Sequence, residues 1–487
     1  MKKYLYTIII VSLLFSCEDF LEEEVFTEYD PSVFLQDEAG VDALLTGAYS
    51  AAVITNFGAI DHFNLTQLNT DETWETGGGL NRRVLPIIEF NWDPSLDYFN
   101  SGYNSFYNAI AAANNVLNVI ESLDNLDDAT LIKIEAEARF LRAFSYYNLH
   151  NYFGPTPIVT VPAGATLDEI EAVGKETPRA TEEEYRSYVS RDLIYASENL
   201  DYGGLSSRAN KGSALALLTK FYLNNKQWEE AAATAQEVIS NGGYVLYDNY
   251  TKLFAVEGED NNEFIFRFEA LVGTNQVNVY IPHAFPPNYP IESNWENFGA
   301  QFRTYTSFYE TFDVNDIRRQ LLISEYIPTT TGELTPLSRD SDSKALDDVR
   351  SFKFVPDPDA AGRFNGNDTP FIRLADIILS RAEALNELNG PTEEGITLIN
   401  EIRDRAKVPT VEVSDFGSKE ELRDFILAER GWELYSESLR REDLIRHNKF
   451  VERAIERGKP AQPHHVVYPL PQAQIDNNPN LEQNPGY

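Results

Sequence analysis

Residues 135–157, EAEARFLRAFSYYNLHNYFGPTP, constrain the fold of this 487-residue chain more than any other stretch. Apolar side chains recur there at steps of three and four residues, the spacing of one face of an α-helix. That face consists of Ile132, Ala136, Phe140, Ala143, Phe144, Tyr147 and Asn151. Gly154 and Pro155 end the helix, because glycine suits a left-handed cap and proline cannot continue the helical hydrogen bonds. Since a second, partly apolar stripe is also present, the sequence predicts a buried helix at the centre of a helical group.

Further stretches with helical periodicity predict a mainly α fold, built from irregular tetratricopeptide-like helical hairpins with long loops and a few short strands. Small and aromatic residues alternate in the pair 210–224 and 227–240, as in a tetratricopeptide hairpin. No strict repeat period runs through the chain, so the repeats are expected to be irregular. The other predicted helices are 38–54, 103–122, 130–153, 182–200, 371–389, 393–407, 419–435 and 442–457.

Four stretches lack helical periodicity. Residues 57–99 are rich in Asn, Asp, Gly and Thr, which predicts a long structured loop. Residues 264–270 alternate like a short strand, and residues 281–298 are a proline- and aromatic-rich loop. Proline-rich residues 462–487 are expected to wrap the surface in an extended form without regular helix.

The N-terminal sequence predicts an exported lipoprotein. Lys2 and Lys3 precede a short apolar run, and residues 14–17, Leu-Phe-Ser-Cys, resemble a bacterial lipobox. Residues 1–16 are therefore expected to be a cleaved signal peptide, with Cys17 carrying the acyl chains that anchor the protein. The alternative is an ordinary signal peptide with an incidental cysteine.

The domain expectation follows from this start. Residues 17–30 include the acidic run EDFLEEE and are read as a solvated tether. Residues 31–487 are expected to form a single domain with halves at about 31–243 and 244–487.

The formal net charge of −37 restricts the partners of this chain. No basic patch offsets the negative charge, so nucleic acid is a poor partner. For the same reason, contact with a membrane is expected only through the lipid anchor.

Several stretches together resemble the SusD/RagB family of outer-membrane nutrient-binding lipoproteins. Residues 135–159 resemble its EAxFLRAxxYFxL helix signature, and the ending 468–487, YPLPQAQIDNNPNLEQNPGY, resembles its closing segment. The other matching stretches are 373–376 with 381–385 (RLAD and RAEAL), 400–406 (NEIRDRA) and 426–433 (ILAERGWE). One departure is visible: Ser438 replaces the usual glycine, and Arg441 and Glu442 replace an aromatic pair.

This resemblance implies a non-enzymatic protein of nutrient uptake and polysaccharide utilisation. It implies binding of a glycan, or in some members a peptide, and delivery to a SusC-type TonB-dependent outer-membrane transporter. The acidic run after the lipobox resembles the export signal for the outer leaflet, which implies an outer-membrane location facing the cell exterior. In such systems the helical repeats face the transporter and the loops carry the ligand.

A glycan site needs exposed aromatic platforms flanked by polar side chains, because sugars present apolar faces and hydroxyl edges. Two loop stretches have this composition. The first offers Trp74, Asn81 and Arg82, and the second offers Tyr289 and Trp295. The alternative for each tryptophan is a plug over the core.

Other chemistries find little support in the sequence. His447, His464 and His465 lack the further ligands that complete a metal site, and no cofactor motif is present. A glycosidase needs two carboxylates at fixed separation, and the sequence selects no pair among 77 acidic residues. A surface glycan hydrolase, a peptide-binding subunit and a helical-repeat scaffold remain the alternatives.

Overall fold

The computed structural model describes residues 37–52, 59–75, 78–124, 126–162, 164–271, 278–299, 301–337 and 348–487. The predicted signal peptide, the tether and Cys17 lie outside these ranges. No helix in the described ranges has the length and apolar character needed to cross a membrane.

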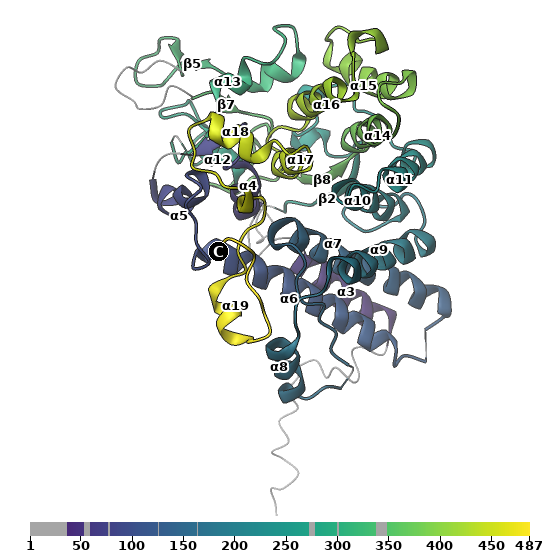
Figure 1. Ribbon diagram of the computed structural model, residues 1–487. Helices are drawn as coiled ribbons and strands as arrows, with labels where there is room; N and C mark the ends of the chain where they lie inside the picture. The colour runs from purple at the N-terminus through teal and green to yellow at the C-terminus, as the bar shows by residue number, and fades with distance from the viewer. Residues whose placement is uncertain are drawn as a thin grey trace, which may run out of the picture.

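A curved stack of long helices forms one side of the molecule (Figure 1). Its centre is the antiparallel pair α6 (Asp97–Ile120) and α7 (Asp128–Phe153), against which α3 (Glu38–Ala52) packs. From α7 the stack continues through successive packed helices, which confirms the predicted mainly α fold of helical hairpins. These are α9 (Glu182–Asn199), α10 (Lys211–Asn224), α11 (Trp228–Asn241), α14 (Leu374–Asn389), α15 (Glu393–Ala406) and α16 (Lys419–Leu434).

Helix α7 is buried along most of its length, as its sequence predicts. The Asp127 side chain accepts hydrogen bonds from the backbone of Ala129 and Thr130, which caps the first turn. At the other end Gly154 has φ 70°, a conformation that favours glycine. The Asp127 cap therefore accounts for the start of α7, and the glycine at position 154 accounts for its end.

Short strands and small helices form the other side of the molecule. The described ranges contain four two-stranded antiparallel sheets there, and the strand predicted near residues 264–270 is confirmed. They pair β1 (Thr73–Glu75) with β3 (Phe302–Thr304), β2 (Phe264–Phe268) with β8 (Thr369–Arg373), β4 (Leu322–Ile323) with β7 (Arg350–Ser351), and β5 (Glu325–Tyr326) with β6 (Thr335–Pro336).

Several sequence expectations about local structure are wrong. The predicted loop 57–99 contains helices α4 (Ala59–Gln67) and α5 (Gly78–Ile88). The predicted helix 442–457 is two short helices, α17 (Arg440–Arg446) and α18 (Phe450–Glu456), separated at Asn448 with φ 57°. Short helices also interrupt the predicted loops 281–298 and 462–487, and the sequence reading missed α13 and α8. These are α12 (Tyr280–Ala284), α13 (Thr306–Tyr309), α19 (Gln472–Asn477) and α8 (Leu167–Glu176).

The tail 462–487 wraps along the molecule, as expected, and lies against the N-terminal half, but α19 contradicts the expectation that it contains no regular helix. The Tyr468 hydroxyl donates to the Leu65 carbonyl at 2.6 Å, and the Asn484 amide donates to the Phe153 carbonyl at 2.9 Å. The Trp92 indole donates to the Tyr487 hydroxyl at 2.8 Å. The tail therefore covers the core around α4, α6 and α7.

A buried ionic network joins α14, α15 and α16 to the strand side. Glu433 is fully buried and accepts hydrogen bonds from Arg373 at 2.6 Å, from Arg318 at 3.2 Å and from Arg405. Arg373 and Arg405 also bind Glu263. Removal of one member would leave a buried opposite charge poorly compensated.

The segment that departs from the family pattern carries backbone strain. Ser438, at the position where the pattern has glycine, has φ 66°. Ser436 also has a positive φ, 61°, but its hydroxyl donates to Ser351 at 2.9 Å. The glycine of the pattern thus coincides with a left-handed backbone position in this chain.

Ser438→Gly is expected to raise the free energy of unfolding by up to about 1 kcal/mol, because glycine relieves the left-handed strain but gains chain entropy on unfolding. Urea unfolding measures the change. Ser436→Gly is the matched control, expected to destabilise because it loses the Ser351 bond. A destabilised Ser438→Gly would contradict the strain assignment.

Candidate ligand-binding surface

Trp74 lies on β1 and faces outward because side chains alternate along a strand. Its neighbours Thr73 and Glu75 are buried, whereas Trp74 is half-buried. The indole stacks on Tyr305 with ring centroids 6.1 Å apart and planes 23° apart. Arg303, paired with Trp74 across the sheet, places its guanidinium carbon 5.2 Å from the indole centroid. Trp74, Tyr305 and Arg303 are named the Trp74 platform.

Asp348 and Arg350 supply polar groups beside this platform. Asp348 Oδ1 lies 3.3 Å from Arg303 Nε and accepts from Arg350 Nε at 2.7 Å. Burial raises the pKa of Asp348, whereas the two guanidiniums act in the opposite direction. Burial also lowers the pKa of Arg303. The cluster combines N–H donors with a carboxylate acceptor, which are the groups that meet sugar hydroxyls.

Four aromatic rings form a second cluster, named the Phe285 stack. Phe285 is buried and lies nearly parallel to Tyr289, with centroids 5.2 Å apart, and to Trp295, with centroids 5.8 Å apart. Tyr289 also stacks on Tyr326 with centroids 6.2 Å apart. Tyr289, Trp295 and Tyr326 are half-buried, so the stack presents ring surface supported from beneath by Phe285.

Residues 348–352 join the two clusters. Asp348 contacts Arg303 of the Trp74 platform, and Phe352 packs edge-on against both Phe285 and Tyr289. Strand β7 lies between them and pairs with β4. We name the two clusters together the aromatic surface.

The structure places the sequence-predicted residues in different surroundings. Tyr289 and Trp295 both stack on Phe285, whereas Trp74 belongs to the neighbouring Trp74 platform. Arg82 is exposed on α5, which packs beside β1, so it comes from a helix and not from the expected loop. Asn81 also lies in α5, and its side chain is outside the described set.

The alternative that the predicted aromatic residues are plugs over the core has partial support, because Tyr289 and Trp295 pack against the main core.

Sequence reasoning missed Arg303, Tyr305, Tyr326 and Asp348. Only the pairing of β1 with β3 brings Arg303 and Tyr305 beside Trp74, and that pairing leaves no local signal.

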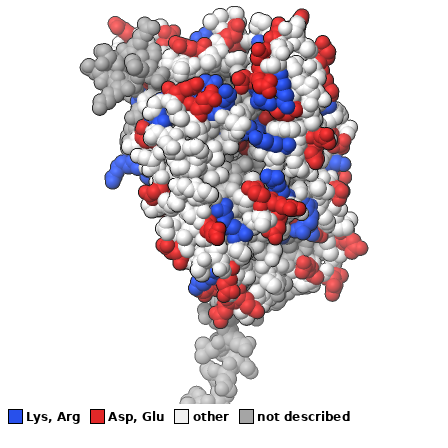
Figure 2. All heavy atoms as spheres, viewed as in Figure 1, with Lys and Arg blue, Asp and Glu red and all other residues white. Residues whose placement is uncertain are grey.

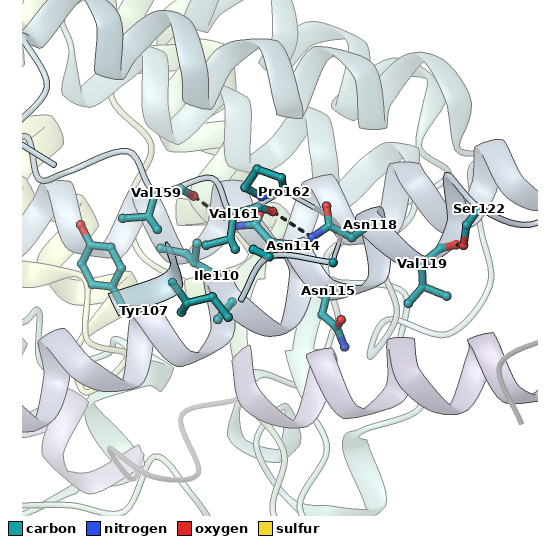
Figure 3. A pocket seen from close by; sticks show the side chains of 14 residues that line it. Tyr107, Ile110, Asn114, Asn115, Asn118, Val119, Ser122, Val159, Val161 and Pro162 are labelled. Carbon is teal, nitrogen blue, oxygen red and sulfur yellow. Dashed lines mark hydrogen bonds between the residues drawn. The ribbon is translucent and has the colours of Figure 1, made fainter. Parts of the chain in front are cut away.

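An apolar pocket of 490 Å³ lies elsewhere, between α6 and residues 159–165 (Figure 3). The Asn114 and Asn118 amides donate to the carbonyls of Val159 and Val161, at 3.1 and 2.9 Å, as the dashed lines show. The described residues that line it include no charged side chain. Because these two side-chain amides already donate to backbone carbonyls, the pocket suits a polar ligand less well than the aromatic surface does.

Acidic and basic side chains are interspersed on the face seen in Figure 2. The described residues contain no group of three or more His, Cys, Asp or Glu side chains arranged to hold a metal ion. The predicted weak candidates have other contacts: His465 packs on Trp92, and His447 lies 3.1 Å from Glu383.

Comparison with known proteins identifies similar chains. Residues 338–461 match the SusD family, and residues 19–223 match the family described as starch-binding associating with outer membrane. The chain is 28% identical to SusD-like protein P25 of Formosa agariphila, covering 96% of this chain and 95% of that protein. It is 24% identical to starch-binding protein SusD of Bacteroides thetaiotaomicron, covering 87% and 85%.

Solved structures show the same fold. A laminarin-binding SusD-like protein superposes with a TM-score of 0.77 at 24% identity, covering 93% of this chain and all of that one. A SusD homologue from Bacteroides thetaiotaomicron superposes with a TM-score of 0.78 at 22% identity, covering 95% and 99%.

Proposed function

The chain belongs to the SusD/RagB family, and from that premise we propose that it captures a glycan on its aromatic surface and delivers it to a transporter. The observation that carries the proposal is the Trp74 platform beside the Phe285 stack, where half-buried rings lie next to Arg303 and Asp348. Aromatic rings stack on the apolar faces of sugars. The guanidinium donates hydrogen bonds to sugar hydroxyls, and the carboxylate accepts hydrogen bonds from them. Relatives described as starch-binding and laminarin-binding support this ligand class.

Titration calorimetry of the purified protein against laminarin, starch and a panel of charged polysaccharides tests the proposal. We expect binding to at least one glycan with no change in its chain length. Release of shortened oligosaccharides would favour a hydrolase, and binding of peptides alone would favour a peptide-uptake subunit. Absence of binding to every glycan in the panel would contradict the proposal.

The partner proposed for this protein is a SusC-type TonB-dependent outer-membrane transporter. Figure 1 shows the long helical hairpins on one side and the elements of the aromatic surface on the other. This arrangement leaves the helical side free to contact a transporter while the aromatic surface holds ligand. Co-purification of a TonB-dependent transporter with the tagged protein from mild-detergent extracts of its own outer membrane would test the assignment, and absence of any such transporter would contradict it.

Cys17→Ser is expected to abolish membrane association, because no acyl chain can be attached without the thiol. Fractionation of cells expressing each form measures the effect, with the variant expected in the soluble fraction. Ser16→Ala, which leaves the thiol intact, is the matched control and should remain in the outer membrane. An outer-membrane location for Cys17→Ser would overturn the lipid-anchor proposal.

A further inference from the structure

A second pocket opens between α13 and α16, close to the Trp74 platform. Its volume is 290 Å³, and polar and aromatic side chains line it together. Among the lining residues are Trp432, Ser307, Thr311, Asp71, Asp424 and Arg453. This mixture of one large ring with hydroxyl, carboxylate and guanidinium groups is unlike the apolar pocket beside α6.

Trp432 is held in place before any ligand arrives. Its indole Nε1 donates to Thr311 Oγ1 at 2.9 Å, which links α16 to the turn that follows α13. The ring also contacts Phe312 and Phe425, with centroids 6.4 and 6.2 Å away. Because the ring is already fixed, binding against it costs little side-chain entropy.

Asp71 is paired with two guanidiniums of this pocket. Arg440 donates two hydrogen bonds to Asp71, at 2.7 and 2.9 Å. Arg453 lies 3.9 Å from Asp71 and donates to Glu456 at 3.1 Å. Although burial raises it, the guanidiniums of Arg440, Arg457 and Arg453 hold the pKa of Asp71 below its usual value, so this carboxylate remains ionised.

Gly431 makes room for this arrangement. A Cβ at position 431 would lie 2.9 Å from a terminal nitrogen of Arg440 and 3.4 Å from the Phe308 ring. The glycine on α16 thus allows Arg440 to reach Asp71. The lining carries carboxylates and guanidiniums in near balance, so an anionic group finds no uncompensated positive charge there.

The pocket and the Trp74 platform share two chain segments. Asp71 lies just before β1, and Tyr305 lies just before α13, which contributes Ser307 to the pocket. The backbone N–H of Tyr305 donates to the Glu72 carbonyl at 3.0 Å, which joins the two segments. The pocket and the platform are therefore built on backbone segments that contact each other directly.

We propose that this pocket is a second saccharide subsite, which takes an uncharged sugar unit from the same glycan chain that lies on the Trp74 platform. The inference rests on the proposed glycan binding. Trp432 contacts the apolar face of the sugar. Arg453 donates to its hydroxyls, and Ser307 and Asp424 accept from them.

Titration calorimetry with laminari-oligosaccharides and malto-oligosaccharides, and with sulfated and uronic oligosaccharides for comparison, each from disaccharide to heptasaccharide, tests the subsite. Trp432→Ala is expected to weaken binding of the longer oligomers about tenfold while the shortest oligomers bind as they do to the unaltered protein. Thr311→Val, which removes the hydroxyl that orients the indole, should give a smaller loss with the same length dependence. Trp228→Ala on α11 is the matched control, and melting curves confirm that each variant is folded.

The outcomes separate the two proposals. If the unaltered protein binds the oligosaccharides and Trp432→Ala binds every length equally well, the subsite is overturned while glycan binding stands. Binding restricted to sulfated or uronic oligosaccharides would overturn the uncharged-sugar assignment alone. Absence of binding to any glycan would overturn both.

Discussion

Glu433→Gln is expected to lower the free energy of unfolding by about 3–5 kcal/mol, the cost of removing one partner from a buried ion pair. Glu433 is fully buried and accepts from Arg318, Arg373 and Arg405. A neutral amide keeps the shape but leaves these guanidiniums with fewer negative partners. Urea unfolding followed by circular dichroism measures the loss.

Glu452→Gln is the matched control, because Glu452 is exposed on α18 and forms a surface ion pair with Lys449, 3.2 Å away. Exposed pairs of this kind contribute about 0–1 kcal/mol. If Glu433→Gln destabilised the protein no more than Glu452→Gln, the network would not be a main contributor to stability.

The same variant is expected to change the dependence of stability on pH. Burial raises the pKa of Glu433, but Arg405, Arg373 and Arg318 outweigh it and hold that pKa well below the usual carboxylate value. A carboxylate with a lowered folded-state pKa stabilises the fold above its unfolded-state pKa. This contribution is lost as the pH falls toward the folded-state value. Between about pH 5 and pH 2, Glu433→Gln should therefore lose less stability than the unaltered protein.

The double variant Trp74→Ala/Trp295→Ala is expected to weaken glycan binding at least about a hundredfold. The Trp74 platform and the Phe285 stack each lose a tryptophan ring, and such rings often dominate binding energy. Each single variant should lose about tenfold. Titration calorimetry with the glycan that binds the unaltered protein measures both. The two rings lie in separate clusters, so the losses are expected to be nearly additive.

Trp295 also packs on Phe285, and its truncation removes core contacts. Trp295→Phe keeps an aromatic ring and separates lost stability from lost ligand contact, while Trp228→Ala controls for the removal of a half-buried tryptophan. Unchanged affinity in a folded double variant would exclude this site but leave the family assignment intact.

The helical part of the fold was largely predictable because its periodicity is local. Helix α7 ends at Phe153, where the sequence predicts, since Gly154 adopts the left-handed conformation expected of it. The break at Asn448 was not predictable, because asparagine is tolerated inside helices and its positive φ depends on surrounding contacts. Residues 371–373 read as helix but form part of β8, because a short apolar run fits either structure.

The candidate site was predictable only in part. Aromatic composition identified Trp74 and Trp295, because large rings in loops carry their own chemical signal. It could not show that Tyr305 and Arg303 lie against Trp74, because β1 and β3 are far apart in sequence. Helix α5 was also missed, because its sequence contains glycine and proline, which usually indicate a loop.

The motifs that mark the family have a shared physical role that was not apparent from their separate positions. Arg373 of the RLAD motif, Arg405 of NEIRDRA and Glu433 of ILAERGWE meet in one buried network. These three motifs therefore contribute directly to the scaffold, and none of them contains a residue of the proposed aromatic surface.

The tail that returns to the N-terminal half has a consequence for the order of folding. The core around α4, α6 and α7 receives Tyr468, Asn484 and Tyr487 from the opposite end of the chain. The ribosome synthesises those residues long after the helices that they cover. If the helices fold first, this part of the core therefore stays exposed to solvent until the tail arrives. Such high contact order slows folding. For the exported lipoprotein proposed above, slow folding would keep the polypeptide unfolded enough to pass through a translocation channel until nearly all of these 487 residues have been synthesised.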